Sequence, residues 1–357
     1  MRVVASPAFK GRAANPYTWS LYDRLGRLGV EVTEFTRRRI LAGSGADIWH
    51  VHWPEGVLVP PNPLKAFVKL QTLLFLLRWA RLKGVRVVWT VHNLGSHPHE
   101  RRHRWLEAWF WRAFIPKVDA YISLTETGRE LATRRFPALA QVPGFVIPHG
   151  HYRGLYPDEV SRADARARLD LPSKARVALF IGQIRPYKNV PGLIEAFAQL
   201  PDEDARLIIA GRVRTRRLRE ILEEKIFGDL RIRAHLDFVP AAEMQLYLRA
   251  ADLVVLPYDE VLNSGSALLA LSFDRPVLAP AKGALRELAG TVGSEWVRLF
   301  EGELRAECLG EALRSTGTPA HRRPNLQPYE WPRIAEATAC AYAEVLDAHD
   351  AYLGQSS

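Results

Sequence analysis

The stretch FIGQIRPYKNVPGLIEAF, residues 180–197, places two cations where an apolar run gives way to an amphipathic helix. The apolar run ends at Gly182, and Arg185 and Lys188 follow before the helical pattern begins. The N-terminus of a helix already carries partial positive charge from its free N–H groups, so more cations there are favourable only when an anion is bound. The stretch therefore predicts a strand, a loop that binds phosphate or carboxylate, and a helix.

Short apolar runs alternate with helical patterns along the rest of the chain. The runs that predict strands in the first half are RVVASPAF, ADIWHVHW, VRVVWTVHN, DAYISLTE and GFVIPHG. Those in the second half are RVALFIGQI, RLIIAGR, LDFVP, DLVVLPYDE and RPVLAPA. Such alternation is typical of parallel sheets covered by helices on both faces, so the chain is expected to be α/β with two doubly wound sheets in series.

The turn-rich segment HGHYRGLYPDEV, 149–160, predicts the seam between the two sheets. We expect a first domain over 1–150, a linker over 151–170, a second domain over 171–325 and a C-terminal helix within 326–357. Ligands of open α/β sheets bind outside the carboxyl ends of the strands, so two domains that face each other would enclose a central cleft.

Composition narrows the class of protein. The 357 residues include only two cysteines, which excludes a disulfide framework, and neither a secretory signal nor an uninterrupted apolar run of about 18 residues is present. We therefore expect a cytoplasmic protein. The net charge of +10 lies wholly in the first part, because residues 1–152 carry +12 and residues 153–357 carry −2. Such a basic half attracts phosphates, anionic lipid or nucleic acid.

A second motif, PYDEVLNSGSALLALSFDRPVLAP, occupies residues 257–280. Tyr258 ends a predicted strand, and Asn263 or Ser264 can cap the helix that follows. Gly265 and Ser266 then offer backbone N–H groups to an anion. The alternative interpretation is an ordinary capped helix in the core.

Together, FIGQIRPYKNVPGLIEAF, LIIAGR, FVPAAEMQLYLRAADLVVLPY and the segment ending in RPVLAP resemble the donor half of GT-B glycosyltransferases. The resemblance is to the bacterial family 4 and its relatives in exopolysaccharide synthesis, and it covers about 175–290 strongly and the remainder loosely. It implies a GT-B fold with two Rossmann-like domains, a nucleotide-diphosphate sugar as donor, and a glycan or lipid-linked acceptor. It also implies that no metal or other cofactor is needed, and that residues 326–357 cross back to the first domain.

The resemblance assigns Gly182 and Lys188 to the donor diphosphate by position. Arg185, Tyr258, Ser264, Gly265 and Ser266 complete the predicted donor site.

Two departures from the family pattern affect this prediction. The family has Arg directly after the glycine, where this chain has Gln183, so we expect Arg185 to replace it because alternate residues of an extended loop point to the same side. The family also has two glutamates separated by seven residues, and the second falls at Leu269, which cannot bind a ribose. The missing glutamate favours inversion over retention of the anomeric configuration.

Polar residues also end two strands of the first half. HVHWPEG, 50–56, contains His50, His52 and Glu55, and VWTVHNLGSHPHE, 88–100, ends its strand at His92 and Asn93. By resemblance to GT-B acceptor domains, we expect Glu55 or His92 to take the acceptor proton or to bind the transferred sugar.

The other histidines of this region are expected to be structural. Those at positions 50, 97, 99 and 103 are interpreted as residues whose hydrogen bonds are satisfied within the fold. No metal site is predicted, because neither an HExxH pattern nor a cysteine pair is present.

The segment HERRHRWLEAWFWRAFIPK, 99–117, interleaves basic and aromatic residues. This composition suits an anionic membrane surface, so the protein is expected either free in the cytoplasm or peripheral at the inner face of the cell membrane. An ordinary helix that packs its tryptophans on the sheet is the equal alternative.

The best interpretation is a glycosyltransferase. The alternatives are a non-transferring GT-B relative and a basic nucleic-acid-binding protein, although no RRM, KH or helix-turn-helix signature supports nucleic acid as a partner. The sequence leaves open GDP against UDP, the sugar, the acceptor and the oligomeric state.

Overall fold

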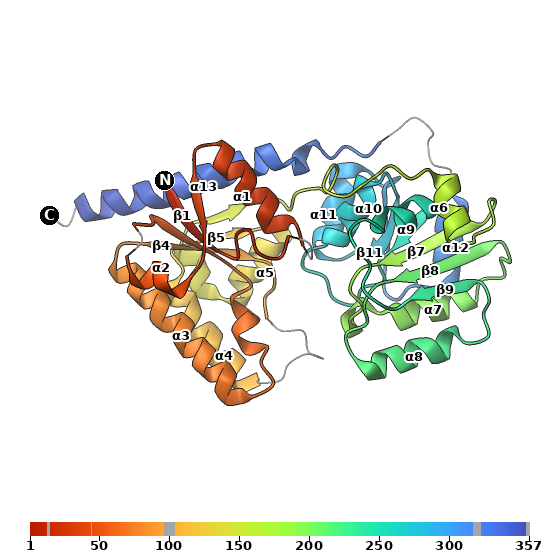
Figure 1. Cartoon of the computed structure of the whole chain (residues 1–357), viewed down its shortest axis with the longest axis horizontal. Coiled ribbons are helices and arrows are strands. Elements are labelled where there is room, and N and C mark those ends of the chain that lie inside the picture. Colours follow the sequence, from red (N-terminus) through yellow and green to blue (C-terminus); the bar gives the residue numbers. More distant parts are fainter. Residues whose placement is uncertain (13–14, 44, 96–103, 317–322, 355–357) are drawn as a thin grey trace. The chain divides into compact units, whose positions relative to one another are not determined.

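The computed structural model contains two compact units, each built around one six-stranded parallel sheet (Figure 1). The first unit is Met1–Gly150 with Pro328–Ser357, and the second is His151–Gln327. The structure describes residues 1–12, 15–43, 45–95, 104–316 and 323–354. The prediction of an α/β chain with two doubly wound parallel sheets is confirmed.

In the first unit the strand order is β2-β1-β3-β4-β5-β6. The strands are β1 (Arg2–Ser6), β2 (Glu31–Glu34), β3 (Ile48–His52), β4 (Arg86–Val91), β5 (Ala120–Ser123) and β6 (Gly144–Val146). The α-helices are α1 (Tyr17–Arg27), α2 (Arg37–Leu41), α3 (Pro63–Leu82), α4 (Arg104–Phe114), α5 (Glu126–Arg135) and α13 (Trp331–Gly354). Short 3-10 helices are η1 (Pro54–Leu58), η3 (Ile115–Lys117) and η4 (Pro137–Gln141).

In the second unit the strand order is β12-β11-β10-β7-β8-β9. The strands are β7 (Arg176–Ile181), β8 (Ala205–Ala210), β9 (Ile232–His235), β10 (Leu253–Val255), β11 (Val277–Pro280) and β12 (Val297–Phe300). The α-helices are α6 (Arg162–Arg168), α7 (Val190–Ala198), α8 (Arg216–Ile226), α9 (Met244–Ala250), α10 (Gly265–Ser272), α11 (Gly283–Val292) and α12 (Ala306–Arg314). The 3-10 helix η5 (Pro186–Lys188) lies in this unit, and η6 (Gln327–Tyr329) leads out of it.

The central strands are apolar because both faces of each sheet are covered. Every residue of β3 is buried, and Trp49 on β3 and Trp89 on β4 are among the largest fully buried side chains. In the second unit, all but the first residue of β7 are buried. These strands are the ones that the sequence pattern predicted.

The sequence prediction differs from the structure mainly at the sheet edges. LDFVP was expected to be a strand, but the strand is β9, which ends just before it, so that prediction is wrong. The edge strands β2 and β12 were not predicted. Within the expected linker 151–170, the structure has the helix α6. The C-terminal helix α13 belongs to the first unit and packs against α1.

Candidate functional site

In each sheet the strands that follow one another in the chain are added first toward one edge and then toward the other, so each sheet has one topological switch point. In the second unit this point lies between β7 and β10, and in the first unit it lies between β1 and β3. Open α/β sheets bind ligands outside the carboxyl ends of the strands at such a point. The two motifs of the second half follow β7 and β10, and HVHWPEG spans the end of β3, so both regions of candidate residues lie at these points.

In the second unit the two motifs meet at Gly182. Gly182 has a φ of 124°, and a Cβ at this position would lie 3.6 Å from both Lys188 Nζ and Ser266 Oγ. The absence of a side chain thus leaves space beside an ammonium and a hydroxyl. The neighbouring Gly211 must also lack a side chain, since its Cβ would collide with the Gly182 carbonyl.

Hydrogen bonds fix the loops after β7 and β10 to each other. The Asp259 N–H donates to the Tyr187 carbonyl at 2.9 Å, and Asn189 Nδ2 donates to Asp259 Oδ1 at 2.9 Å. Asn189 adopts a left-handed conformation with a φ of 47°, and its side chain caps α7. The loop that carries Lys188 is therefore held against the loop that leads to α10.

The N-terminus of α10 is built as the sequence predicted. Ser264 Oγ accepts the Ala267 N–H at 3.2 Å, so the predicted cap is confirmed, and the helix begins at Gly265. The first N–H groups of the helix have no partners within the helix and carry partial positive charge. Lys188 and Ser266 thus stand beside a helix terminus that favours an anion.

Burial changes the acid–base properties of this region. It lowers the pKa of Lys188, an effect that Tyr187 opposes and Arg185 reinforces. The Lys188 ammonium lies 5.2 Å from the centre of the Tyr258 ring. Burial also raises the pKa of Tyr258 to about 12, although the hydroxyls of Ser266 and Ser264 partly lower it. A bound anion would favour the charged form of Lys188 and offset the effect of its burial.

The remaining residues of the predicted donor site are placed differently. Arg185 Nε donates to Gln183 Oε1 at 2.7 Å, and Arg185 is not among the side chains beside Gly182. Leu269 is buried within α10, in agreement with the absence of the family glutamate. The assignment of Gly182, Arg185, Lys188, Tyr258, Ser264, Gly265 and Ser266 to a donor stays a prediction.

In the first unit, Glu55 and His92 lie close to each other. The His92 ring stacks on Trp53 with centroids 4.1 Å apart, and Trp53 directly precedes η1, which carries Glu55. Asn93 Nδ2 donates to Glu55 Oε1 at 2.9 Å. The structure therefore brings together the two residues predicted to be catalytic, and their role stays a prediction.

His92 is also hydrogen-bonded to a buried network of polar side chains that the sequence did not predict. His52 Nδ1 lies 2.9 Å from His92 Nε2, and His52 Nε2 lies 2.6 Å from Tyr22 Oη on α1. His50 lies 2.6 Å from Tyr342 Oη on α13 and 2.7 Å from Thr90 Oγ1. His50 thus has the satisfied structural role expected for it. Tyr22 and Tyr342 were missed because they lie on helices far from the strands in sequence.

Burial makes the imidazoles of the first unit weak bases. It lowers the pKa of His50 to about 3 and that of His149 to about 4, and it lowers the pKa of His52 and His92 well below the usual value. All four are therefore neutral near pH 7. His149 Nδ1 lies 2.7 Å from the Gly150 carbonyl, which can only accept, so Nδ1 carries the proton and Nε2 is an acceptor.

Glu55 responds to burial in the opposite sense. Burial raises the pKa of Glu55, and the charge of Glu107 adds to this effect. The hydrogen bond from Asn93 lowers the pKa in part. A carboxyl group of this kind is a stronger base than an exposed one.

The segment 99–117 is only partly described, since residues 99–103 lie outside the described range. In α4, Phe110, Trp111 and Phe114 are buried, whereas Trp105 and Trp109 are exposed. The packing interpretation therefore holds for three aromatic rings of this helix. The membrane interpretation stays a prediction for the two tryptophans that face solvent.

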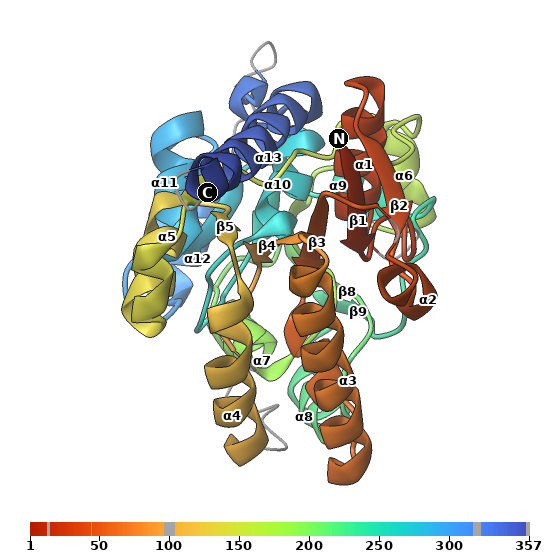
Figure 2. The same ribbon diagram turned by 90° about the vertical axis from the view of Figure 1, so that its left-hand side faces the viewer.

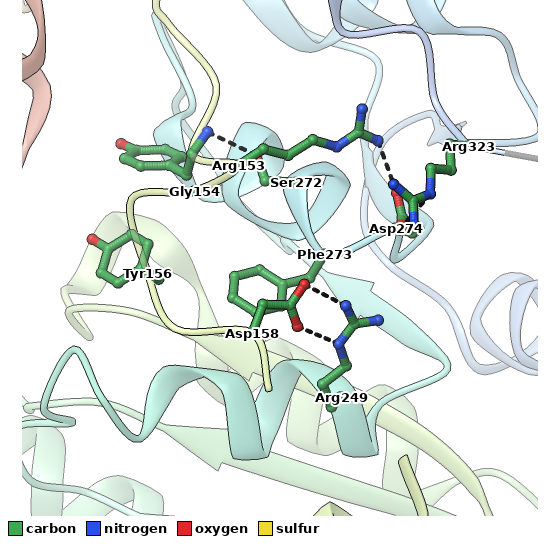
Figure 3. A pocket seen from close by; sticks show the side chains of 10 residues that line it. Arg153, Gly154, Tyr156, Asp158, Arg249, Ser272, Phe273, Asp274 and Arg323 are labelled. Carbon is green, nitrogen blue, oxygen red and sulfur yellow. Dashed lines mark hydrogen bonds and ion pairs between the residues drawn. The ribbon is translucent and has the colours of Figure 1, made fainter. Parts of the chain in front are cut away.

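A small cavity of about 180 Å³ lies in the second unit, where the chain enters and leaves it (Figure 3). Its charged side chains are paired with each other, as Arg153 donates to Asp274 at 2.8 Å and Arg249 binds Asp158 with two hydrogen bonds. These ion pairs hold the entering segment on α9 and α10.

The described part of the chain contains neither a group of metal ligands nor a membrane-spanning helix. Within it, no group of three or more His, Cys, Asp or Glu residues is arranged to hold a metal ion. Its helices include none that is both long and apolar enough to cross a membrane.

Comparisons with known proteins place these features in a family. The family described as "Glycosyl transferase 4-like domain" matches residues 12–150, and the one described as "Glycosyl transferases group 1" matches residues 161–293. The chain is 36% identical over 338 residues to the GDP-mannose:glycolipid 4-beta-D-mannosyltransferase of Xanthomonas campestris pv. campestris, covering 93% of this chain and 89% of the relative. It is 30% identical over 396 residues to the D-inositol 3-phosphate glycosyltransferase of Mycobacterium bovis, covering 94% and 80%.

Solved structures share the fold. Sucrose-phosphate synthase from Thermosynechococcus elongatus superimposes with a TM-score of 0.70 at 19% identity, covering 97% of this chain and 99% of the other. The Anabaena protein Alr3699/HepE in complex with UDP superimposes with a TM-score of 0.61 at 15% identity, covering 99% and 100%.

The chain therefore belongs to the GT-B glycosyltransferases of the family 4 type. As a member of this family, it transfers a sugar from a nucleotide-diphosphate sugar to a glycan or lipid-linked acceptor.

Proposed function

We propose that the chain transfers mannose from GDP-mannose to a glycolipid, with inversion, in exopolysaccharide or glycoconjugate synthesis. The donor and acceptor are those in the name of the Xanthomonas relative, which matches nearly the whole chain. The donor site is proposed because Lys188 Nζ and Ser266 Oγ both lie beside the open space at Gly182. An ammonium, a hydroxyl and a helix N-terminus together suit a diphosphate.

Inversion follows from the proposed product. The mannose of GDP-mannose is linked α to phosphate, and a relative named for a 4-beta linkage forms the opposite anomer. In such a displacement the acceptor oxygen bonds to the anomeric carbon while the bond to phosphate breaks, and GDP leaves with the electron pair. One group must take the proton of the acceptor hydroxyl.

We assign this base to His92. Its ring is held by stacking on Trp53 and by the hydrogen bond with His52, and it is neutral near pH 7, as a base must be. Glu55 is the alternative base, and its hydrogen bond from Asn93 also suits a carboxylate that positions the sugar hydroxyls. No assigned step requires a metal.

The experiment that tests this function is a screen of nucleotide-sugars followed by analysis of the product. Of the nucleotide-sugars screened, we expect only GDP-mannose to be hydrolysed slowly when no acceptor is present. With a lipid-linked glycan as acceptor, we expect mannose to be transferred as the β anomer. His92→Ala is expected to lower kcat by about 10²–10⁴-fold, as for the loss of a general base, and Glu55→Gln by less. An α-linked product, or near-normal kcat in both variants, would overturn the assignment.

We further propose that the surface of α3 and α4 rests on the membrane that carries the acceptor. The two helices lie side by side (Figure 2) and Phe67 stacks on Trp109 with centroids 5.9 Å apart. Both helices expose large apolar side chains, among them Leu64 at 68% and Trp105 at 65%. We call this set the α3–α4 surface: Leu64, Phe67, Val68, Phe75, Trp105 and Trp109.

Charge favours an anionic membrane as the partner of the α3–α4 surface. Lys65, Lys69 and Arg104 are exposed, α3 contains no acidic residue, and the one acidic residue of α4, Glu107, is buried. Apolar rings with flanking cations are typical of peripheral binding at headgroup depth. This arrangement supports attachment at the inner face of the cell membrane, without a spanning helix.

Vesicle sedimentation tests the α3–α4 surface. The protein should bind vesicles of phosphatidylglycerol and phosphatidylcholine but not pure phosphatidylcholine, and high salt should release it. Each cation near an anionic surface contributes about 1 kcal/mol, so Lys65→Glu with Lys69→Glu should weaken binding by roughly 30-fold or more. The matched control, Arg134→Glu with Arg135→Glu on α5, should bind normally. Equal binding to both lipids, or equal loss in the control, would contradict the proposal.

A further inference from the structure

Six polar side chains of the first unit lie along one line of polar contacts. In order they are Thr90, His50, Tyr342, Tyr22, His52 and His92. Four hydrogen bonds of 2.6 to 2.9 Å form two runs, Thr90–His50–Tyr342 and Tyr22–His52–His92, and the phenols of Tyr342 and Tyr22 interact where the runs meet. Five members are buried, and His92 is half-buried.

The hydrogen bonds along such a line all run from donor to acceptor in the same direction. A neutral imidazole carries one N–H and one lone pair, and a phenol donates one hydrogen while it accepts another. If Tyr22 donates to His52 Nε2, then His52 Nδ1 donates to His92 Nε2, and the proton of His92 resides on Nδ1. If the line runs the other way, His92 Nε2 donates to His52 Nδ1 and His92 Nδ1 is the acceptor.

Burial prevents one ring from reversing alone. A single reversed imidazole would place two N–H groups, or two lone pairs, against each other where water cannot replace the lost bonds. Leaving one buried donor or acceptor unsatisfied corresponds to roughly a 5- to 150-fold bias in an equilibrium. The tautomer of His92 is therefore imposed from the interior of the unit.

We propose that His52 and Tyr22 are positioning residues that hold His92 in the tautomer with the proton on Nε2, so that Nδ1 accepts the proton of the acceptor hydroxyl. The direction rests on the proposed function, since only this tautomer makes His92 Nδ1 a base. The hydrogen bonds from Tyr22 through His52 to His92 are observed independently of that function. Tyr342 extends the line onto α13, so the C-terminal helix contributes to the same network.

Nitrogen-15 NMR of histidine-labelled enzyme tests the tautomer without any substrate. The His92 signals are assigned by their loss in His92→Ala. We expect the Nε2–H tautomer in the wild type and a mixture of both tautomers in Tyr22→Phe and His52→Phe. The Nδ1–H tautomer in the wild type would overturn the proposal, and so would an Nε2–H tautomer that both variants leave unchanged.

Steady-state kinetics test the consequence for the reaction. His52→Phe should lower kcat by roughly 10- to 100-fold with little change in KM, because the ring is replaced and its hydrogen bonds are lost. His52→Asn should restore most of kcat, because its amide oxygen can take the place of Nδ1 as acceptor from His92. Tyr121→Phe, which removes another buried phenol from the same sheet, is the matched control and should retain normal kcat.

The two kinds of measurement separate the possible failures. If His92→Ala retains normal kcat, the assignment of the base is wrong, whatever the tautomer. If His92→Ala loses activity but His52→Phe and His52→Asn behave alike, the positioning role of His52 is wrong and the base assignment stands.

Discussion

The carboxyl ends of the two parallel sheets carry opposite kinds of chemistry. At the end of the second sheet, Lys188 and Ser266 stand beside Gly182 and the N-terminus of α10, with space left by the missing side chain. At the end of the first sheet, His52 and His92 are connected to Tyr22, and burial keeps the imidazoles neutral. One edge favours a bound anion, and the other holds neutral imidazoles in fixed hydrogen bonds.

This difference between the two edges is the one expected from their proposed roles, a diphosphate site and a general base. A diphosphate needs positive charge and N–H donors that are ready before it arrives, so an open position with a cation is favourable. A base must be neutral and correctly oriented, so low polarity and a fixed hydrogen-bond partner are favourable. In the proposed function, the same β-α architecture thus supports a donor site and a base through the residues that follow its strands.

The largest expected effect is the loss of the first unit when α13 is removed. Trp331 lies against Gly150 and Tyr17, and Tyr342 satisfies His50. Trp331→Ala alone should destabilise the unit by about 3–5 kcal/mol, as for other buried tryptophans, and deletion of residues 331–357 by more. Hydrogen exchange should show faster exchange throughout 1–150 and unchanged exchange in 176–300. Unchanged exchange in 1–150 would show that α13 is not part of this unit's core.

The next largest effect is expected from acid, which should lower the stability of the first unit in particular. His50 has a folded pKa of about 3 and His149 one of about 4, against about 6.5 in the unfolded chain. The unfolded state therefore binds more protons below pH 6.5, and stability is present above that pH and lost as the pH falls toward 4 and 3. Between pH 7.5 and 5.0 each of these groups should remove about 2 kcal/mol from the free energy of unfolding of the first unit.

Tryptophan fluorescence can follow this loss selectively. Nine of the ten tryptophans belong to the first unit, and only Trp296 belongs to the second. Urea denaturation at the two pH values should therefore show a lower midpoint at pH 5.0 by fluorescence. A midpoint that does not change with pH would mean that these histidines are charged in the folded state, or that their pKa values do not differ between the folded and the unfolded states.

A smaller effect is expected for Arg185 than for Lys188. Arg185 is partly exposed and its guanidinium donates to Gln183, so it contributes to an anion mainly through a screened charge. Arg185→Ala should weaken GDP binding by less than about tenfold, which corresponds to about 1.4 kcal/mol. A larger loss, measured by calorimetry, would show that Arg185 turns toward the phosphates when the donor binds, as the sequence pattern suggested.

The sequence predicted the central strands and the capped start of α10 because both are local. β7 is a continuous apolar run followed by Gly182 and a helical pattern, and Ser264 caps α10 as its position indicates. Of the edge strands, β6 was predicted, whereas β2 and β12 were missed and β9 was placed too late in the chain, because an edge is partly solvated. β2 consists of EVTE and three of the four residues of β9 are exposed, so neither shows an apolar pattern.

The network of the first unit could be predicted only in part. His52 and His92 end strands that the pattern indicates, so their proximity follows from the register of neighbouring parallel strands. Tyr22 reaches His52 from α1, and Tyr342 reaches His50 from α13, nearly 300 residues after His50 in the chain. No local periodicity specifies which face of a distant helix packs on the sheet, and such contacts require the fold.

Calorimetric titration of GDP into four proteins tests most directly the claim that the carboxyl ends of the two sheets have separate functions. The wild type, Lys188→Ala and His92→Ala are compared, with Arg216→Ala on α8 as the control for loss of a surface cation. Lys188→Ala should weaken binding by roughly 10- to 150-fold, since a charge-assisted contact contributes about 1.5–3 kcal/mol. His92→Ala should bind GDP with wild-type affinity although it has lost activity. Wild-type affinity in Lys188→Ala, or an equal loss in His92→Ala, would contradict the account.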